Sequence, residues 1–264
     1  MAILTLALVS FCAWLGSTLA GGGSPFVLIP LVDLMLGTAS VTPVITLGML
    51  IGNAHRILLF WRDIDWPLTA WYAPGAVIGA VLGAYTYTQV HLDWLQILTG
   101  LFLLVSIVGL GLTPKDTKFT VKAWYILPAA IAKAFVSGLI GTTGPVLNPF
   151  YLNYGLNKEQ LLATKATHVV MIHTIKLLTY SVLGVLTLKM LGMGFVIGLA
   201  AIPANFLGRA ILAKMNGQQF RVLVLSTMAL SGISMLWGSL AVNDNFRTVL
   251  SALAQSPFIK LFWS

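Results

Sequence analysis

Ten apolar stretches, separated by short polar connections, occupy most of this 264-residue chain. Hydrophobic residues make up 58% of the sequence and charged residues 8%, whereas a soluble domain carries roughly 25% charged residues. A helix needs about 20 apolar residues to cross a hydrocarbon layer ~30 Å thick. The sequence therefore predicts an all-α polytopic membrane protein, in contact with the lipid bilayer and without room for a soluble catalytic module. The stretches are 2–20, 25–36, 42–60, 67–88, 94–112, 123–140, 145–153, 161–186, 190–212 and 219–241.

The net charge of +8 comes from fifteen scattered Lys and Arg residues. They form no basic run of the kind that binds nucleic acid, so we expect no nucleic-acid partner. The single cysteine, Cys12, excludes a disulfide within the chain. There is no His-Glu cluster and no nucleotide-binding motif, so we expect no metal site and no cofactor.

Two of the apolar stretches, 25–36 and 145–153, are too short to cross a bilayer, because as helices they would rise only ~18 and ~14 Å. Each follows a glycine-rich break, Gly21–Pro25 or Gly141–Pro145, and the two breaks are 120 residues apart. At the same offset Asn53 and Arg56 fall opposite His173 and Lys176, and at an offset of 125 Gly83 falls opposite Gly208. This register predicts an internal duplication. The expected parts are a first membrane repeat (1–112), a cytoplasmic linker (113–122), a second membrane repeat (123–241) and an interfacial C-terminal tail (242–264).

The orientation of the two repeats depends on how often each crosses the membrane. If each break turns the chain back, every repeat has a glycine-broken short-helix pair plus three full spans, and the repeats are inverted. In that arrangement ten basic residues, Arg56 and Lys165 among them, lie at or near the cytoplasmic face and three at the other. A parallel arrangement divides the same residues eight to five. The excess of basic residues on one face favours the inverted repeats.

The glycine breaks are candidate substrate-binding elements. Non-helical backbone is tolerated inside a membrane only where protein buries it or where it lines a cavity, and paired breaks indicate a transporter site. The proline after each break suits the first turn of a new helix, whose N-terminus favours an anion. The alternative is that the small residues only permit close helix packing. The candidate residues in the breaks are Gly22, Gly23, Ser24, Thr142, Thr143 and Gly144.

Basic residues inside the apolar stretches extend the candidate substrate site. Arg56 and Lys176 occupy matching positions of the two repeats, as do Asn53 and His173, and His168 lies on the same segment as His173. A charge within a membrane usually faces a cavity or the bundle interior. Arg56 could instead extend its charge to the membrane surface, and the histidines could be neutral packing residues.

Acidic residues provide the complementary signal, because all but Asp33 fall in connections or at segment ends. Buried basic residues without buried acids favour a negatively charged cargo. Lys133 and Arg209 are further basic residues within apolar stretches, and the sequence leaves their roles open.

The two breaks, their spacing and the length of the repeats resemble the TauE/SafE sulfite exporter family over residues 10–240. The resemblance implies a multi-pass carrier in the bacterial plasma membrane for sulfite, sulfonates or related anions, driven by ion gradients, and not an enzyme. Alternating access with export is the expected mechanism. A passive anion channel, or a membrane enzyme that uses His168 and His173, are the alternatives. The sequence leaves open which ion is coupled, a proton or another, and whether the protein forms a homodimer.

Overall fold

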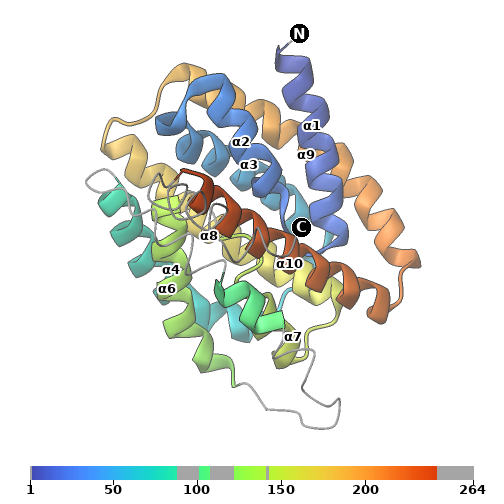
Figure 1. Ribbon diagram of the computed structural model, residues 1–264. Helices are drawn as coiled ribbons and strands as arrows, with labels where there is room; N and C mark the ends of the chain where they lie inside the picture. The colour runs from blue at the N-terminus through green and yellow to red at the C-terminus, as the bar shows by residue number, and fades with distance from the viewer. Residues whose placement is uncertain (1, 88–100, 108–121, 141–142, 243–264) are drawn as a thin grey trace, which may run out of the picture.

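The computed structural model describes residues 2–87, 101–107, 122–140 and 143–242, and these residues are almost entirely helical (Figure 1). They contain no β-strand, so the predicted all-α class is confirmed. The α-helices are α1 (Ala2–Leu19), α2 (Ser24–Leu36), α3 (Thr38–Leu59), α4 (Trp66–Tyr87), α6 (Ile126–Ile140), α7 (Asn148–Tyr154), α8 (Lys158–Val182), α9 (Leu188–Lys214) and α10 (Gly217–Val242), together with the helical residues 101–107. Two short 3₁₀ turns are η1 (Trp61–Asp63) and η2 (Ala123–Tyr125).

Six described helices are long and apolar enough to cross a membrane: α1, α3, α4, α8, α9 and α10. The protein is therefore a polytopic membrane protein, as its composition predicts. Most of the expected linker and nearly all of the expected tail lie outside the described residues, as does most of the 94–112 stretch.

Local sequence signals account for the helix starts. At α8, the Asn157 side chain accepts a hydrogen bond from the Gln160 amide (2.8 Å), and the Gln160 side chain accepts one from the Asn157 amide (3.1 Å). This reciprocal pair satisfies two of the donors that every helix N-terminus leaves free. At α2, Pro25 lies in the first turn after Gly23, as expected.

The second break differs from the expectation. Residues 144–147 form turns, with bonds from Val146 to Thr143 and from Asn148 to Pro145, and the helix begins only at Asn148. The prediction that Pro145 opens the second short helix is therefore wrong. A second proline, Pro149, occupies the first turn instead, where its missing N–H costs nothing.

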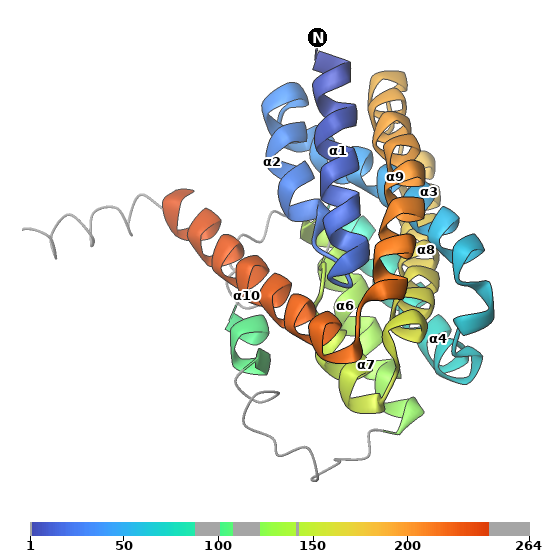
Figure 2. The ribbon, with the colours of Figure 1, turned by 90° about the vertical axis from the view of Figure 1, so that its right-hand side faces the viewer.

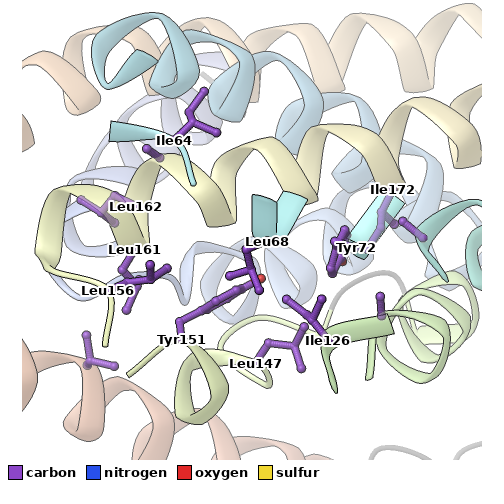
Figure 3. Close-up of a cluster of buried hydrophobic side chains, with 14 of the residues drawn as sticks. Ile64, Leu68, Tyr72, Ile126, Leu147, Tyr151, Leu156, Leu161, Leu162 and Ile172 are labelled. Carbon is purple, nitrogen blue, oxygen red and sulfur yellow. The ribbon is translucent and has the colours of Figure 1, made fainter. Parts of the chain in front are cut away.

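The helices form two hydrophobic cores, and each core contains one helix from the other expected repeat. One core joins α1, α2 and α3 with α9, through residues such as Trp14, Leu28, Ile45 and Ala201. The other core joins α6, α7 and α8 with α4, and includes Tyr72, Ile126, Tyr151 and Ile172 (Figure 3). In each case three helices of one repeat pack with the fourth helix of the other. The pattern fits a duplicated ancestor, while the repeat boundaries stay a prediction.

Helix α10 is not aligned with the other helices of the two cores. It crosses the bundle diagonally in both views and its C-terminal end leads away from the other helices (Figure 2). Its buried side, which includes Phe220, Val224 and Met228, belongs to the same core as α4 and α8. A Cβ atom at Gly21 would lie 3.3 Å from Val224, and one at Gly23 would lie 2.7 Å from Thr227. The helix therefore covers the outer side of the first glycine break.

Glycines let helices from the two expected repeats approach closely. A Cβ atom at Gly83 of α4 would collide with the Phe135 carbonyl of α6, and one at Gly208 of α9 would lie 2.7 Å from Thr18 of α1. Gly83 and Gly208 are the positions that the expected duplication aligns. The equivalent glycines therefore serve equivalent helix contacts, which supports the small-residue packing expected between membrane helices.

Gly138 provides a direct test of this close packing. An added Cβ would lie 2.6 Å from the Ala84 amide nitrogen, and backbone cannot rotate away as a side chain can. We expect Gly138→Ala to lower the free energy of unfolding by about 1–3 kcal/mol, as overpacking does. Thermal unfolding in detergent measures this loss. Gly192→Ala is the matched control, because no atom lies within 4 Å of its added Cβ; equal stability of the two variants would contradict the proposed contact.

Candidate functional site

The two glycine breaks meet inside the protein. Gly21, Gly22 and Gly23 have φ values of 65°, 137° and 113°, which side-chain-bearing residues rarely adopt, so the glycines permit the turn between α1 and α2. The Asn148 side chain, at the start of α7, donates a hydrogen bond to the Gly21 carbonyl (3.4 Å). Gly144 packs against the Phe26 ring of α2, which would lie 2.7 Å from an added Cβ. Each break therefore contacts the helix that follows the other break.

A small hollow of about 30 Å³ lies between the breaks. This volume accommodates about two water molecules. Two pairs of lining residues, Ser24 with Gly144 and Met49 with Val169, are each separated by the 120-residue repeat offset. The hollow therefore lies where equivalent positions of the two expected repeats face each other. Its lining residues are Trp14, Ser17, Gly22, Gly23, Ser24, Pro25, Met49, Asn53, Arg56, Gly144, Lys165 and Val169.

Lys165 of α8 connects the two breaks across this hollow. Its ammonium group donates to the Gly21 carbonyl of the first break and to the Asn148 side-chain oxygen beside the second, at 2.7 Å. Only 6% of the residue is exposed. A Cβ atom at Gly22 would lie 2.6 Å from the Lys165 nitrogen, so a glycine is needed there for the ammonium to approach the backbone.

Arg56 of α3 forms the opposite side of the hollow. Its guanidinium donates to the Thr18 hydroxyl (2.8 Å), the Asn205 side-chain oxygen (3.2 Å) and the Asn53 side-chain oxygen (3.4 Å). It also lies 5.1 Å from the centre of the Trp14 ring. The residue is 4% exposed, so its side chain is held in the interior and does not extend to the membrane surface.

Several donors around the hollow have no acceptor among the described residues. The side-chain donors are Arg56 Nε and Trp14 Nε1, both fully buried. The backbone amides of Gly23 and Ser24, at the N-terminus of α2, also have no backbone acceptor in the described segments. No carboxylate in the described segments lies within ion-pair distance of Arg56 or Lys165. A site that offers two cations and free N–H groups favours an anion.

Six residues expected at the site line the hollow, and the other expected residues that the structure describes do not. Those that line it are Gly22, Gly23, Ser24, Asn53, Arg56 and Gly144. Thr143 is buried within the second break but is not part of the lining, and Thr142 lies outside the described residues.

His168 lies one helical turn beyond Lys165 in a separate polar cluster. Its ring nitrogens are paired with the Tyr151 hydroxyl (2.8 Å) and the Thr69 hydroxyl (3.3 Å), and its ring stacks on Tyr72 with centroids 3.7 Å apart. His173 is also buried, and its Nδ1 has no partner among the described residues. Neither histidine lines the hollow, and the bonds of His168 fit the packing alternative.

Lys176 is fully buried and donates to the carbonyl of Ser137 in the last turn of α6 (2.7 Å). Arg56 reaches Thr18 in the last turn of α1. The two cations, which the expected repeat aligns, therefore bind corresponding helix ends, where a positive charge is favourable. Because Lys176 lies outside the hollow, the geometry indicates a role in holding α6.

Arg209, whose role the sequence leaves open, is exposed on α9 and lies over the Phe60 ring at 5.4 Å. Its charge also reaches Asp63 in η1. Burial raises the pKa of the Asp63 carboxyl and Glu159 adds to this effect, while Arg209 opposes it. Arg209 therefore belongs to a surface group of charges at the end of α3 and not to the hollow.

Lys165, Trp14, Asn148 and Asn205 are the site residues that sequence reasoning missed. The charge distribution predicts Lys165 and Arg56 at or near the cytoplasmic face, but both are buried. A single amide within a long apolar stretch, such as Asn205, is the signal that could have identified that residue. Trp14 carries no comparable signal, because one tryptophan in an apolar helix is ordinary. The inverted orientation, inferred partly from these charges, stays a prediction.

These features define a polytopic α-helical membrane protein with a buried cationic hollow between two broken segments. The family model described as "Sulfite exporter TauE/SafE" matches residues 6–235, nearly the whole chain. The chain therefore belongs to the TauE/SafE sulfite exporter family, a family of membrane transporters, as the sequence resemblance predicts. Comparisons with curated proteins and with solved structures find no match.

Proposed function

We propose that the protein is a secondary transporter that carries sulfite, sulfonates or related small sulfur-containing anions across the bacterial plasma membrane, with export as its direction. The observation that carries this proposal is the set of buried donors without acceptors around the hollow. Sulfite and sulfonates present three oxygen acceptors on one sulfur atom. Such a group can accept from Arg56, Trp14 and the α2 amides at once, while its charge offsets the two buried cations.

The size of the hollow supports alternating access as the mechanism. A sulfite ion has four heavy atoms and needs more room than the two waters that about 30 Å³ would hold. The walls must therefore separate when the anion enters. Lys165 can supply this movement, because its ammonium can exchange the Gly21 carbonyl or the Asn148 oxygen for an anion oxygen. Opening the breaks toward either face in turn then moves the anion across the membrane.

Counterflow in proteoliposomes tests the proposed function. Liposomes loaded with unlabelled sulfite should transiently concentrate labelled sulfite from outside, because a carrier exchanges one anion for another. A passive channel would only equilibrate the label. Absence of sulfite and sulfonate counterflow from folded wild-type protein would reject the proposal.

Trp14→Phe links this transport to the hollow. The change removes one N–H donor and keeps an aromatic ring beside Arg56. A hydrogen bond to a charged group contributes about 1.5–3 kcal/mol, so the half-saturating sulfite concentration should rise roughly 10- to 100-fold. Trp71→Phe is the matched control, because Trp71 is 48% exposed. Equal affinities of the two variants would exclude Trp14 as a substrate donor.

A further inference from the structure

Lys133 of α6 is a buried basic residue that the anion hollow does not use. It is 4% exposed, and its ammonium nitrogen has no hydrogen-bond partner among the described residues. The nitrogen lies 5.5 Å from the centre of the Tyr72 ring. The Tyr72 hydroxyl is fully buried and also has no described partner. An ammonium has three donors to satisfy, so this site holds a charged lysine poorly.

Ion pairing does not explain why a lysine is buried at position 133 either. No described carboxylate lies within ion-pair distance of it, and its positive charge acts on Lys165, His168 and His173 of α8. A methionine would fill similar volume without an unpartnered polar atom, so packing does not require a lysine. The titratable groups on the elements around α6 are, from α4, Tyr72, Tyr85 and Tyr87; from η2, Tyr125; from α7, Tyr151 and Tyr154; and from α8, Lys158, Glu159, Lys165, His168, His173, Lys176 and Tyr180.

We propose that Lys133 binds a proton that crosses the membrane together with the anion. The inference rests on the proposed transport function and adds the coupled ion and its site. The neutral amine takes up a proton from the aqueous phase on one side, and the ammonium releases it on the other. The Tyr72 ring face supports the charged form while the proton is held.

Electrostatics couples the proton to the anion. With the hollow empty, a charge on Lys133 is opposed by Lys165. An anion beside Lys165 offsets that repulsion and favours proton uptake, and by reciprocity a proton on Lys133 favours the anion. Proton and anion therefore move in the same direction. A doubly charged sulfite with one proton carries one net negative charge, so a membrane potential that is negative inside still favours export.

The proton-to-sulfite ratio of Lys133→Met tests this inference. Labelled sulfite flux and internal pH are recorded together in proteoliposomes, with the membrane potential clamped by potassium and valinomycin. We expect the variant to keep counterflow and its proton flux to fall by about one proton per anion, because methionine cannot take up a proton. The titration of sulfite itself contributes equally to wild type and variant. The melting temperature should stay at or above that of the wild type.

A second variant and a surface control complete the test. In Lys133→Arg the guanidinium keeps its proton permanently. This variant should therefore still exchange sulfite in counterflow, but it should lose net sulfite transport that is coupled to a proton. Lys189→Met, at an exposed position of α9, should keep the wild-type ratio. An unchanged ratio in Lys133→Met would overturn the inference, as would loss of counterflow in both folded Lys133 variants. Wild-type protein without any sulfite counterflow would instead reject the transport function itself.

Variants of Tyr72 distinguish a proton-binding Lys133 from a lysine with only a structural role. Tyr72→Phe keeps the ring and should keep the ratio, while Tyr72→Leu removes the π face. In Tyr72→Leu the proton binds more weakly, so half-maximal coupled transport should move to lower pH. A merely structural Lys133 would leave this pH profile unchanged.

Discussion

Replacing Lys165 with methionine is expected to weaken sulfite binding roughly 100-fold, equivalent to about 3 kcal/mol, and to reduce transport at low sulfite concentrations to the same degree. Lys165 is the residue whose ammonium contacts both breaks, through the Gly21 carbonyl and the Asn148 side chain. A bound anion would therefore lose its charge-assisted bond and the group that positions the two breaks around it. The dissociation constant, obtained from sulfite-dependent thermal shifts of purified protein, measures the effect.

The Lys165→Met variant also leaves two polar groups less well satisfied, so its stability needs a separate control. The Gly21 carbonyl keeps only the bond from Asn148 (3.4 Å). Lys165→Gln retains an N–H donor but not the charge, and should recover stability without recovering sulfite affinity. Lys189→Met, an exposed lysine on α9, should bind as the wild type does. Wild-type affinity in folded Lys165→Gln would show that the charge does not contribute to the site.

The fold could be predicted from the sequence where hydrophobic length alone decides the structure. The stretches at 2–20 and 25–36 correspond to α1 and α2, because the glycines at 21–23 end the first apolar helix and Pro25 suits the first turn of the second. The exchange of α4 and α9 between the two cores could not be predicted in this way. It depends on the close helix contacts that Gly83 and Gly208 permit, and such contacts between distant segments leave no periodic signal.

In the candidate site, too, the residues marked by local sequence could be predicted, and those positioned by contacts between distant segments could not. The breaks and Arg56 were recognisable because glycines and a charge are unusual inside apolar stretches. Lys165 is seven residues into α8, close to a polar connection, and its position resembles that of a residue at the membrane surface. Its burial follows from α7, which places Asn148 within 2.7 Å of its ammonium group. Lys176 was recognisable as a charge inside an apolar stretch at the position that matches Arg56. It nevertheless lies outside the hollow, so a matching repeat position alone does not identify a site residue.

Replacing Arg56 with lysine should reduce sulfite transport at least roughly tenfold although the positive charge is retained, because the two side chains donate hydrogen bonds in different geometries. The planar guanidinium bonds Thr18, Asn205 and Asn53 simultaneously, and its Nε has no partner among the described residues. A lysine is shorter and cannot make all of these contacts. At least one buried acceptor then loses its partner, which costs about 1–3 kcal/mol of folding free energy.

The outcome for Arg56→Lys distinguishes recognition by geometry from recognition by charge alone. Proteoliposome counterflow gives the transport loss, and thermal unfolding gives the stability loss in the same preparation. Arg209→Lys is the matched control, because Arg209 is exposed and lies over Phe60 away from the hollow. If Arg56→Lys transported sulfite as well as Arg209→Lys, a point charge would be sufficient and the guanidinium network would serve only to support α3. A selective loss in Arg56→Lys, with the melting temperature above the assay temperature, would instead show that the geometry of the guanidinium donors contributes to anion recognition.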